Sequence, residues 1–236
     1  GKLRKIGVLS ANQYGFIGNR MMDPYGREAE RMLLEGATPR QIDDALERFG
    51  MAMGILAVFD LAGVDVGYKI RQERQAFLPD DPSFYRASAL LVEHGMLGQK
   101  SGSGYYRYEP GSRERFDNPA ALQLFADEAA RLNIPQRKIP DQEIVERCLY
   151  SLINEGAMVL EEEVALRASD VEVVYTAGYG FPRHRGGPMF YADTVGLKAI
   201  CARIDEFATQ LDPQYWKAAN LLRELSERGG SLADHA

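Results

Sequence analysis

One polar side chain of this sequence stands in a setting suited to chemistry: Asn19, in the stretch YGFIGNR. Gly15 and Gly18 permit a tight turn just before it and a helical pattern follows, so we expect Asn19 at the head of a helix. Asparagine commonly caps helices at such a place. Spacing alone favours this structural role over the alternative, an amide directed at a ligand.

A second candidate is Lys100, in the loop GMLGQKSGSGYYRY. The loop is rich in glycine and serine, as phosphate-binding loops are, but it lacks the preceding strand and following helix that those motifs require. The pattern instead predicts a surface hairpin in which Tyr105, Tyr106 and Tyr108 pack partly on helices. Lys100 remains a candidate contact for an anionic ligand.

Three basic residues lie together in an otherwise acidic chain: Arg183, His184 and Arg185. A solvated turn and a docking surface are equally good interpretations. The other histidines, His94 and His235, are isolated in the sequence, and His184 has no acid partner or nucleophile close to it. We therefore expect neither a nucleophile-base pair nor a metal site.

The composition narrows the class of protein further. The 236 residues carry a net charge of -6, which argues against a nucleic-acid partner, and no apolar run approaches the length of a membrane span. Cys148 and Cys201 lie on apolar helical patterns without metal-ligand spacing, so we expect reduced core thiols of an intracellular protein.

The fold is predicted to be mainly α. Lys5 to Ser10 reads as one short strand, and its only possible partners, Gly104 to Tyr108 and Val173 to Ala177, are short and lie among helical patterns. A single strand cannot satisfy its edge hydrogen bonds. The simplest interpretation is the last strand of a domain that precedes this chain, and a start at glycine fits it.

The helical patterns occur twice. The first copy opens with a long helix whose buried stripe includes Tyr25 and Met32 and which Gly36 stops. Next comes a capping box in ATPRQIDDAL, with Thr38 as N-cap, Pro39 as the first helical residue and Gln41 returning the hydrogen bond.

The second copy repeats this order, with a long helix in Ile144 to Ala165 and a capping box at Ser169 to Glu172. Both copies then contain a G-x5-D-x2-G motif, at Gly54 to Gly63 and at Gly187 to Gly196. Two copies are too few for a solenoid, so we expect them to pack as an internal pseudo-dimer. The predicted domains are a terminal strand (1–10), a first helical domain (11–130), a linker (131–139) and a second helical domain (140–236).

The stretches YGFIGNRM, DLAGVDVGYKIR, GQKSGSGYYRY, ERCLYSLINEGAMVLEE and GYGFPRHRGGPMFYAD resemble the C-terminal part of 3-hydroxyacyl-CoA dehydrogenases. The resemblance is closest to the multifunctional enzymes of fatty-acid β-oxidation, of the peroxisomal bifunctional type. It implies two tandem helical domains of the 6-phosphogluconate dehydrogenase C-terminal-like type. They follow a Rossmann domain, and the opening strand would be the last strand of that domain.

The same resemblance implies the chemistry. The parent enzyme is expected to oxidise an L-3-hydroxyacyl-CoA with NAD, using a His-Glu pair of the Rossmann domain. Neither that pair nor the NAD fingerprint is in this chain, so we expect no cofactor-binding residue here and no activity of this fragment alone. Asn19 matches the asparagine of the family's GFxxNR motif, which approaches the catalytic histidine and the substrate. This match reverses the preference for the capping role. Where many relatives read GPF, this chain has Gly54, Ile55 and Leu56, which puts the local turn in doubt.

The resemblance also implies the partners. They are an acyl-CoA substrate, the Rossmann domain and a possible enoyl-CoA hydratase region of the same chain. Single-function relatives dimerise through such domains, so the tandem copies predict a monomer. The compartment would be the cytoplasm in a bacterium and the peroxisome in a eukaryote. The competing hypothesis is a non-catalytic helical association module of another Rossmann-plus-helical dehydrogenase, and Asn19 in its GFxxNR setting is the feature that distinguishes the two.

Overall fold

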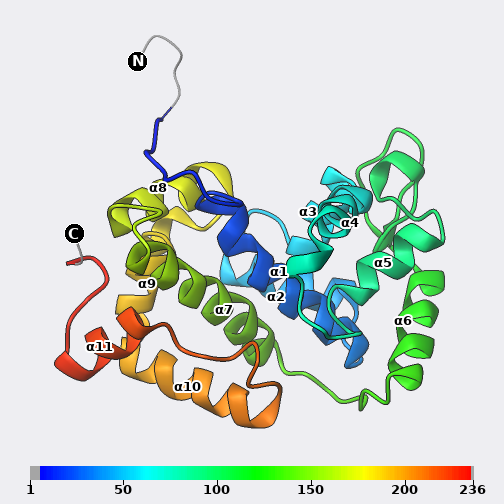
Figure 1. Ribbon diagram of the computed structural model, residues 1–236. Coiled ribbons are helices and arrows are strands. Elements are labelled where there is room, and N and C mark those ends of the chain that lie inside the picture. The colour runs from blue at the N-terminus through cyan, green and yellow to red at the C-terminus, as the bar shows by residue number, and fades with distance from the viewer. Residues whose placement is uncertain (1–5, 235–236) are drawn as a thin grey trace. The chain divides into compact units, whose positions relative to one another are not determined.

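The computed structural model describes residues 6–234, and within them it is mainly helical, as predicted (Figure 1). None of the described helices is long and apolar enough to cross a membrane. Short 3-10 turns lie at Gln75–Phe77, Gln99–Ser101 and Arg183–Arg185. The α-helices are α1 (Gly18–Leu34), α2 (Pro39–Phe49), α3 (Ile55–Ala62), α4 (Val64–Glu73), α5 (Arg86–Glu93), α6 (Pro119–Arg131), α7 (Asp141–Glu161), α8 (Ala168–Gly178), α9 (Pro188–Val195), α10 (Leu197–Gln210) and α11 (Asn220–Arg228).

The chain folds into two compact units. Unit 1 consists of Gly1–Tyr25 together with Glu146–Ala236, and unit 2 is Gly26–Val145. Helix α1 therefore begins in unit 1 and ends in unit 2, whereas α7 begins in unit 2 and ends in unit 1. These units group residues by contact in space, and the tandem copies group them by sequence pattern. The predicted domain bounds of 11–130 and 140–236 stay a prediction.

The two copies of the glycine motif adopt the same backbone. Gly63 ends α3 and begins α4 with φ 98° and ψ 117°, and Gly196 ends α9 and begins α10 with φ 98° and ψ 119°. A positive φ of this size favours glycine, which explains its presence at both junctions. At the departure from GPF the turn is intact: Gly54 is the N-cap of α3, and its N–H donates to Glu47 Oε1 at 3.0 Å.

The first predicted capping box is half right. Thr38 is the N-cap of α2 and accepts a hydrogen bond from Gln41 N at 3.1 Å, with Pro39 as the first helical residue. The Gln41 side chain does not return the bond to Thr38, because its Nε2 donates to Ile139 O at 2.7 Å. The carbonyl of Ile139, distant in the sequence, has thus taken the place of Thr38 as the hydrogen-bond partner of the Gln41 side chain.

The second predicted box is wrong. Helix α8 starts at Ala168 after Arg167, which makes no side-chain cap, so Ser169 already lies inside the helix. The strand-like piece Val173 to Ala177 is also helical, within α8. Its β-branched residues favour a strand locally, but Val171 and Tyr175 on the same helix face are buried, and this packing decides the conformation.

The predicted opening strand is not found in the residues of it that the structure describes. Ile6–Ser10 has no regular secondary structure, and Lys5 lies outside the described residues. No other described segment pairs with this stretch as a strand, and without a partner a strand has no ladder of hydrogen bonds to hold it.

The predicted hairpin exists, as the antiparallel pair β1 (Tyr106–Arg107) and β2 (Phe116–Asp117). Its register sets Tyr106 opposite Asp117. Tyr105, Tyr106 and Tyr108 are more deeply buried than expected and belong to the core of unit 2.

Each unit has its own apolar core. Unit 1 buries Met21 of α1 with Met189 of α9, and a Cβ at Gly156 of α7 would lie within 2.7 Å of both methionine methyls. Cys148 and Cys201 are buried free thiols of this unit, as predicted.

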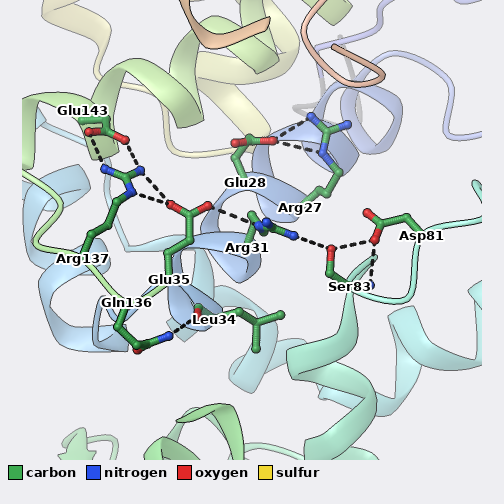
Figure 2. A network of polar contacts seen from close by, with 10 residues as sticks. All are labelled: Arg27, Glu28, Arg31, Leu34, Glu35, Asp81, Ser83, Gln136, Arg137 and Glu143. Carbon is green, nitrogen blue, oxygen red and sulfur yellow. Dashed lines mark hydrogen bonds and ion pairs between the residues drawn. The ribbon is translucent and has the colours of Figure 1, made fainter. Parts of the chain in front are cut away.

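In unit 2, charged side chains tie the segment before α7 to the end of α1 (Figure 2). Glu35, whose side chain is 6% exposed, pairs with Arg31 at 3.3 Å and with Arg137 at 2.7 Å. Arg137 also pairs with Glu143, and Gln136 Nε2 donates to Leu34 O at 2.6 Å.

Candidate functional site

The turn that precedes α1 has little conformational freedom. Gly15 has a φ of 76°, and its carbonyl accepts hydrogen bonds from Asn19 N at 3.1 Å and Arg20 N at 3.3 Å. A Cβ at Gly15 would lie 2.6 Å from Arg20 N, so only glycine fits. Phe16 also adopts a positive φ of 50° and leaves 54% of its surface exposed. The predicted tight turn is confirmed, and it presents an aromatic ring and then Asn19 on the surface of unit 1.

Asn19 is the second residue of α1 and is exposed. Its Oδ1 accepts a hydrogen bond from the hydroxyl of Tyr179 at 2.6 Å, and Tyr179 directly follows the end of α8. The amide Nδ2 donates no hydrogen bond within residues 6–234. The side chain is thus held at its oxygen and open at its nitrogen.

Tyr179 is itself held by its neighbours. Its ring stacks on Tyr175, with centroids 5.0 Å apart and planes 27° apart. The Tyr175 hydroxyl donates to Gly18 O at 3.0 Å. A Cβ at Gly18 would lie 2.2 Å from a ring carbon of Tyr179, so the absence of a side chain at Gly18 lets the ring lie against the turn.

Arg20 fastens the start of α1 to α7 within unit 1. Its Nε lies 2.6 Å from Glu155 Oε1, and its two terminal nitrogens lie 2.7 and 3.0 Å from the oxygens of Glu162. The hydrogen bond to Glu162 is the main cause of the raised pKa of Arg20. Arg20 therefore forms ion pairs with two carboxylates of this unit, and these pairs orient the helix that carries Asn19.

Sequence reasoning found Asn19 but missed Tyr179, Tyr175 and Arg20 as its supports. Tyr179 lies within the quoted stretch GYGFPRHRGGPMFYAD, but no spacing links it to a residue 160 positions away.

Lys100 belongs to unit 2, in the 3-10 turn Gln99–Ser101. Its ammonium group pairs with Asp65, which also accepts from Lys69 Nζ at 3.0 Å. The hydrogen bond from Lys100 is the main cause of the lowered pKa of Asp65. About half of the Lys100 side chain is exposed. Asn19 and Lys100 lie in different units, and the structure describes each within its own unit.

The basic cluster forms the 3-10 turn Arg183–Arg185. Arg183 and His184 are exposed, and the Arg185 guanidinium lies 5.7 Å from the centroid of the Tyr191 ring. A solvated turn and a docking surface both remain compatible with this geometry. Among residues 6–234 there is no group of three or more histidine, cysteine or acidic side chains arranged to hold a metal ion, and His235 lies outside that range.

Comparison with known families gives one family model, 3-hydroxyacyl-CoA dehydrogenase, C-terminal domain, which matches residues 15–108 and 144–231. The first match contains Asn19 and Lys100, and the second contains Tyr179.

Among curated proteins, the chain is 43% identical to the peroxisomal bifunctional enzyme of Danio rerio over 97% of its own length, and 40% identical to that of Homo sapiens over the same share. It spans only 34% and 33% of these two relatives, about a third of their length. Among solved structures, the dehydrogenase part of multifunctional enzyme 1 from C. elegans matches with a TM-score of 0.73 and 28% identity, over 94% of this chain and 50% of that one.

Proposed function

This chain belongs to the family of 3-hydroxyacyl-CoA dehydrogenase C-terminal domains, and from that premise we propose that it is the helical C-terminal part of an NAD-dependent L-3-hydroxyacyl-CoA dehydrogenase of fatty-acid β-oxidation. The relatives named above support a multifunctional parent. The resemblance of the sequence motifs implies that this parent also carries an enoyl-CoA hydratase region. In a eukaryote such a parent would lie in the peroxisome, and in a bacterium in the cytoplasm.

The proposed reaction converts the 3-hydroxyl of the acyl-CoA into a ketone. The hydroxyl proton leaves to a base, and NAD, when bound, accepts the hydride from C3. The glycine-rich loop containing Lys100 does not fit a dinucleotide site, because it follows helix α5 and leads into strand β1, the reverse of the strand–turn–helix order of such a site. We therefore assign NAD and the base to a Rossmann domain outside this chain.

Asn19 is the proposed contribution of this chain to the chemistry. The observation that carries the proposal is the exposed amide of GFxxNR, set in a turn that Gly15 and Arg20 hold in place. In the assembled parent we propose that this amide hydrogen-bonds the reacting oxygen of the substrate or the catalytic histidine. Such a bond strengthens as charge develops, and so it accelerates the reaction.

The test is Asn19→Ala and Asn19→Asp in the full-length parent, with turnover and melting temperature measured on the same preparations. Losing one hydrogen bond in a desolvated site costs about 1 to 3 kcal/mol, roughly five- to one-hundred-and-sixty-fold in rate. A matched control is Asn220→Ala, which removes another exposed asparagine of unit 1 in the first turn of a helix, where Nδ2 donates to Glu161 at 2.7 Å. Asn220→Ala should leave turnover unchanged.

The aspartate variant separates the two roles of Asn19. Aspartate can still accept from Tyr179 and is favourable in the first turn of a helix, but it replaces the amide donor with a carboxylate. If Asn19→Asp keeps both the melting temperature and the turnover of the parent, the catalytic role is wrong and the non-catalytic association module becomes the better proposal.

We propose Lys100 as a contact for an anionic group of the acyl-CoA. Asp65 already neutralises Lys100 in part, and Lys69 shares the same carboxylate. Lys69→Met is thus a matched control for Lys100→Met. The proposal predicts a raised KM for the CoA substrate with Lys100→Met alone, and equal effects of the two variants would contradict it.

The pseudo-dimer remains part of the proposal. Residues matching one family model occur in both halves of the chain, and the two glycine motifs share one backbone geometry. Two such copies in one chain would replace the partner subunit of a dimer, and the parent would be a monomer.

A further inference from the structure

We infer that Tyr179 is a positioning residue for Asn19, which makes the amide nitrogen of Asn19 the atom offered to the reaction. This inference rests on the proposed role of Asn19 and specifies which half of the amide performs it. It also assigns a task to the second half of the sequence, because Tyr179 follows α8.

The first argument is the hydrogen bond itself. A carboxamide oxygen only accepts, so the Tyr179 hydroxyl, 2.6 Å from Asn19 Oδ1, is the donor. The opposite face of the amide then carries the two N–H donors of Nδ2, which have no acceptor within residues 6–234. Without the hydroxyl, an exposed amide on α1 is free to rotate about its last torsion and present either atom.

The second argument is that the Tyr179 ring has a single place to lie. It stacks on Tyr175, and it lies against Gly18, where any Cβ would collide with it at 2.2 Å. Tyr175 lies in α8, is buried, and donates to Gly18 O, so the residue under the Tyr179 ring is tied to the turn that carries Asn19. Partial burial also raises the pKa of Tyr179, which keeps the hydroxyl protonated as a donor at neutral pH.

The consequence is a choice between the two contacts proposed for Asn19. When the substrate hydroxyl gives its proton to the base, its oxygen gains negative charge and accepts hydrogen bonds more strongly. The base becomes protonated in the same step, and a protonated histidine has no acceptor left. A donor held outward therefore suits the substrate oxygen and does not suit the charged base.

The experiment is a double-mutant cycle in the full-length enzyme, with wild type, Asn19→Ala, Tyr179→Phe and the double variant. Phenylalanine keeps the stacked ring and removes only the hydroxyl. Tyr179→Phe should lower kcat about two- to twelve-fold and leave KM within about twofold. In the Asn19→Ala background the same change should have no further effect, because no amide remains to be oriented.

Two tyrosine variants serve as controls. Tyr175→Phe removes the hydroxyl that bonds Gly18 O and leaves the bond from Tyr179 to Asn19, so it reports loss of local stability without loss of the amide's orientation. Tyr191→Phe removes a half-buried hydroxyl elsewhere in unit 1 and should leave kcat unchanged.

The outcomes separate this inference from the proposed function. If Asn19→Ala lowers kcat but Tyr179→Phe does not, or if their effects multiply in the double variant, the positioning role is overturned while the catalytic role of Asn19 stands. If Asn19→Ala leaves kcat unchanged, the proposed function fails and Tyr179 has nothing to position. Equal losses of kcat from Tyr175→Phe and Tyr179→Phe, in parallel with melting temperature, would also overturn the inference.

Discussion

Asp43 and Glu172 occupy matching positions in the two units, each the fifth residue after the N-cap of its helix, α2 or α8. Each carboxylate accepts hydrogen bonds from backbone N–H groups in the first turn of the following helix. Asp43 accepts from Leu56 N at 3.0 Å and Ala57 N at 2.9 Å, and Glu172 accepts from Phe190 N at 2.6 Å. A carboxylate at a helix N-terminus satisfies amides that the helix leaves unpaired. The two sites differ in their second oxygen, since Asp43 Oδ2 also accepts from Tyr106 and Glu172 Oε2 is buried without a partner in the described residues.

Glu172 should make stability depend on pH. Burial raises its pKa from 4.5 to about 7, so between these values the folded state keeps a proton that the unfolded state releases. The free energy of unfolding then falls as pH rises through this window, by up to about 3 kcal/mol. In Glu172→Gln this contribution is absent, and urea unfolding at pH 5 and pH 8 should show a smaller decline than in the wild type.

The control for this prediction is Glu227→Gln, which removes an exposed carboxylate from α11 of the same unit. It should keep the wild-type decline between pH 5 and pH 8. An unchanged decline in Glu172→Gln would mean that Glu172 is ionised throughout this range.

Gly18→Ala should destabilise the protein. The new methyl group would lie 2.2 Å from the Tyr179 ring, which must move away from Tyr175 and Asn19. Overpacking of this kind costs about 1 to 3 kcal/mol. Gly178→Ala is the matched control, because Gly178 precedes Tyr179 and a Cβ there meets nothing within 4 Å. Thermal unfolding should show a lower melting temperature for Gly18→Ala only, and equal melting temperatures would show that the ring is not confined.

Asp60 and Asp193 stand at the same place in the two glycine motifs, and their loss should have unequal effects. Asp60 is fully buried and accepts from Tyr105 N, Tyr106 N and the Tyr108 hydroxyl at 2.9 to 3.0 Å. Asp60→Ala leaves these buried donors without an acceptor and should lower the free energy of unfolding by about 3 kcal/mol or more.

Within residues 6–234, Asp193 accepts from two backbone N–H groups, those of Leu232 and Ala233, and its side chain is partly exposed to water. Asp193→Ala should cost about 1 kcal/mol. Urea denaturation of both variants gives the comparison, and a larger loss from Asp193→Ala would contradict this ranking by burial.

The isolated 236-residue chain should fold but not bind NAD. The proposed pseudo-dimer lets each helical copy bury its apolar stripe, so light scattering should give a monomer and a thermal melt one sharp transition. Titration calorimetry should detect no micromolar affinity for NAD. A stable dimer would count against the pseudo-dimer, and micromolar NAD binding would overturn the assignment of the cofactor to another domain.

Local chemistry explains which features could be predicted. The Thr38–Pro39 helix start and the tight turn at Gly15 depend on the residues that form them, and both are observed. The capping box predicted at Ser169 and the strand-like piece predicted after it were wrong, because the packing of α8 outweighs local conformational preference. The predicted hydrogen bond from the Gln41 side chain back to Thr38 was wrong for a similar reason, since Gln41 Nε2 donates to Ile139, which lies 98 residues away in the sequence. Tyr179 could not be found from spacing at all, because only the folded chain brings it to Asn19.

The division of the chain between the two units sets the order in which the units are completed during synthesis. Unit 2 is one continuous stretch, so a ribosome completes it while most of unit 1 is still unmade. The turn with Asn19 is translated early, yet Tyr179 emerges only 160 residues later. Closing so long a loop is slow compared with the local contacts of unit 2. The side chain of Asn19 therefore gains its hydrogen-bond donor late in synthesis, and a nascent protein interrupted before Tyr179 would lack the hydroxyl that bonds Asn19 Oδ1.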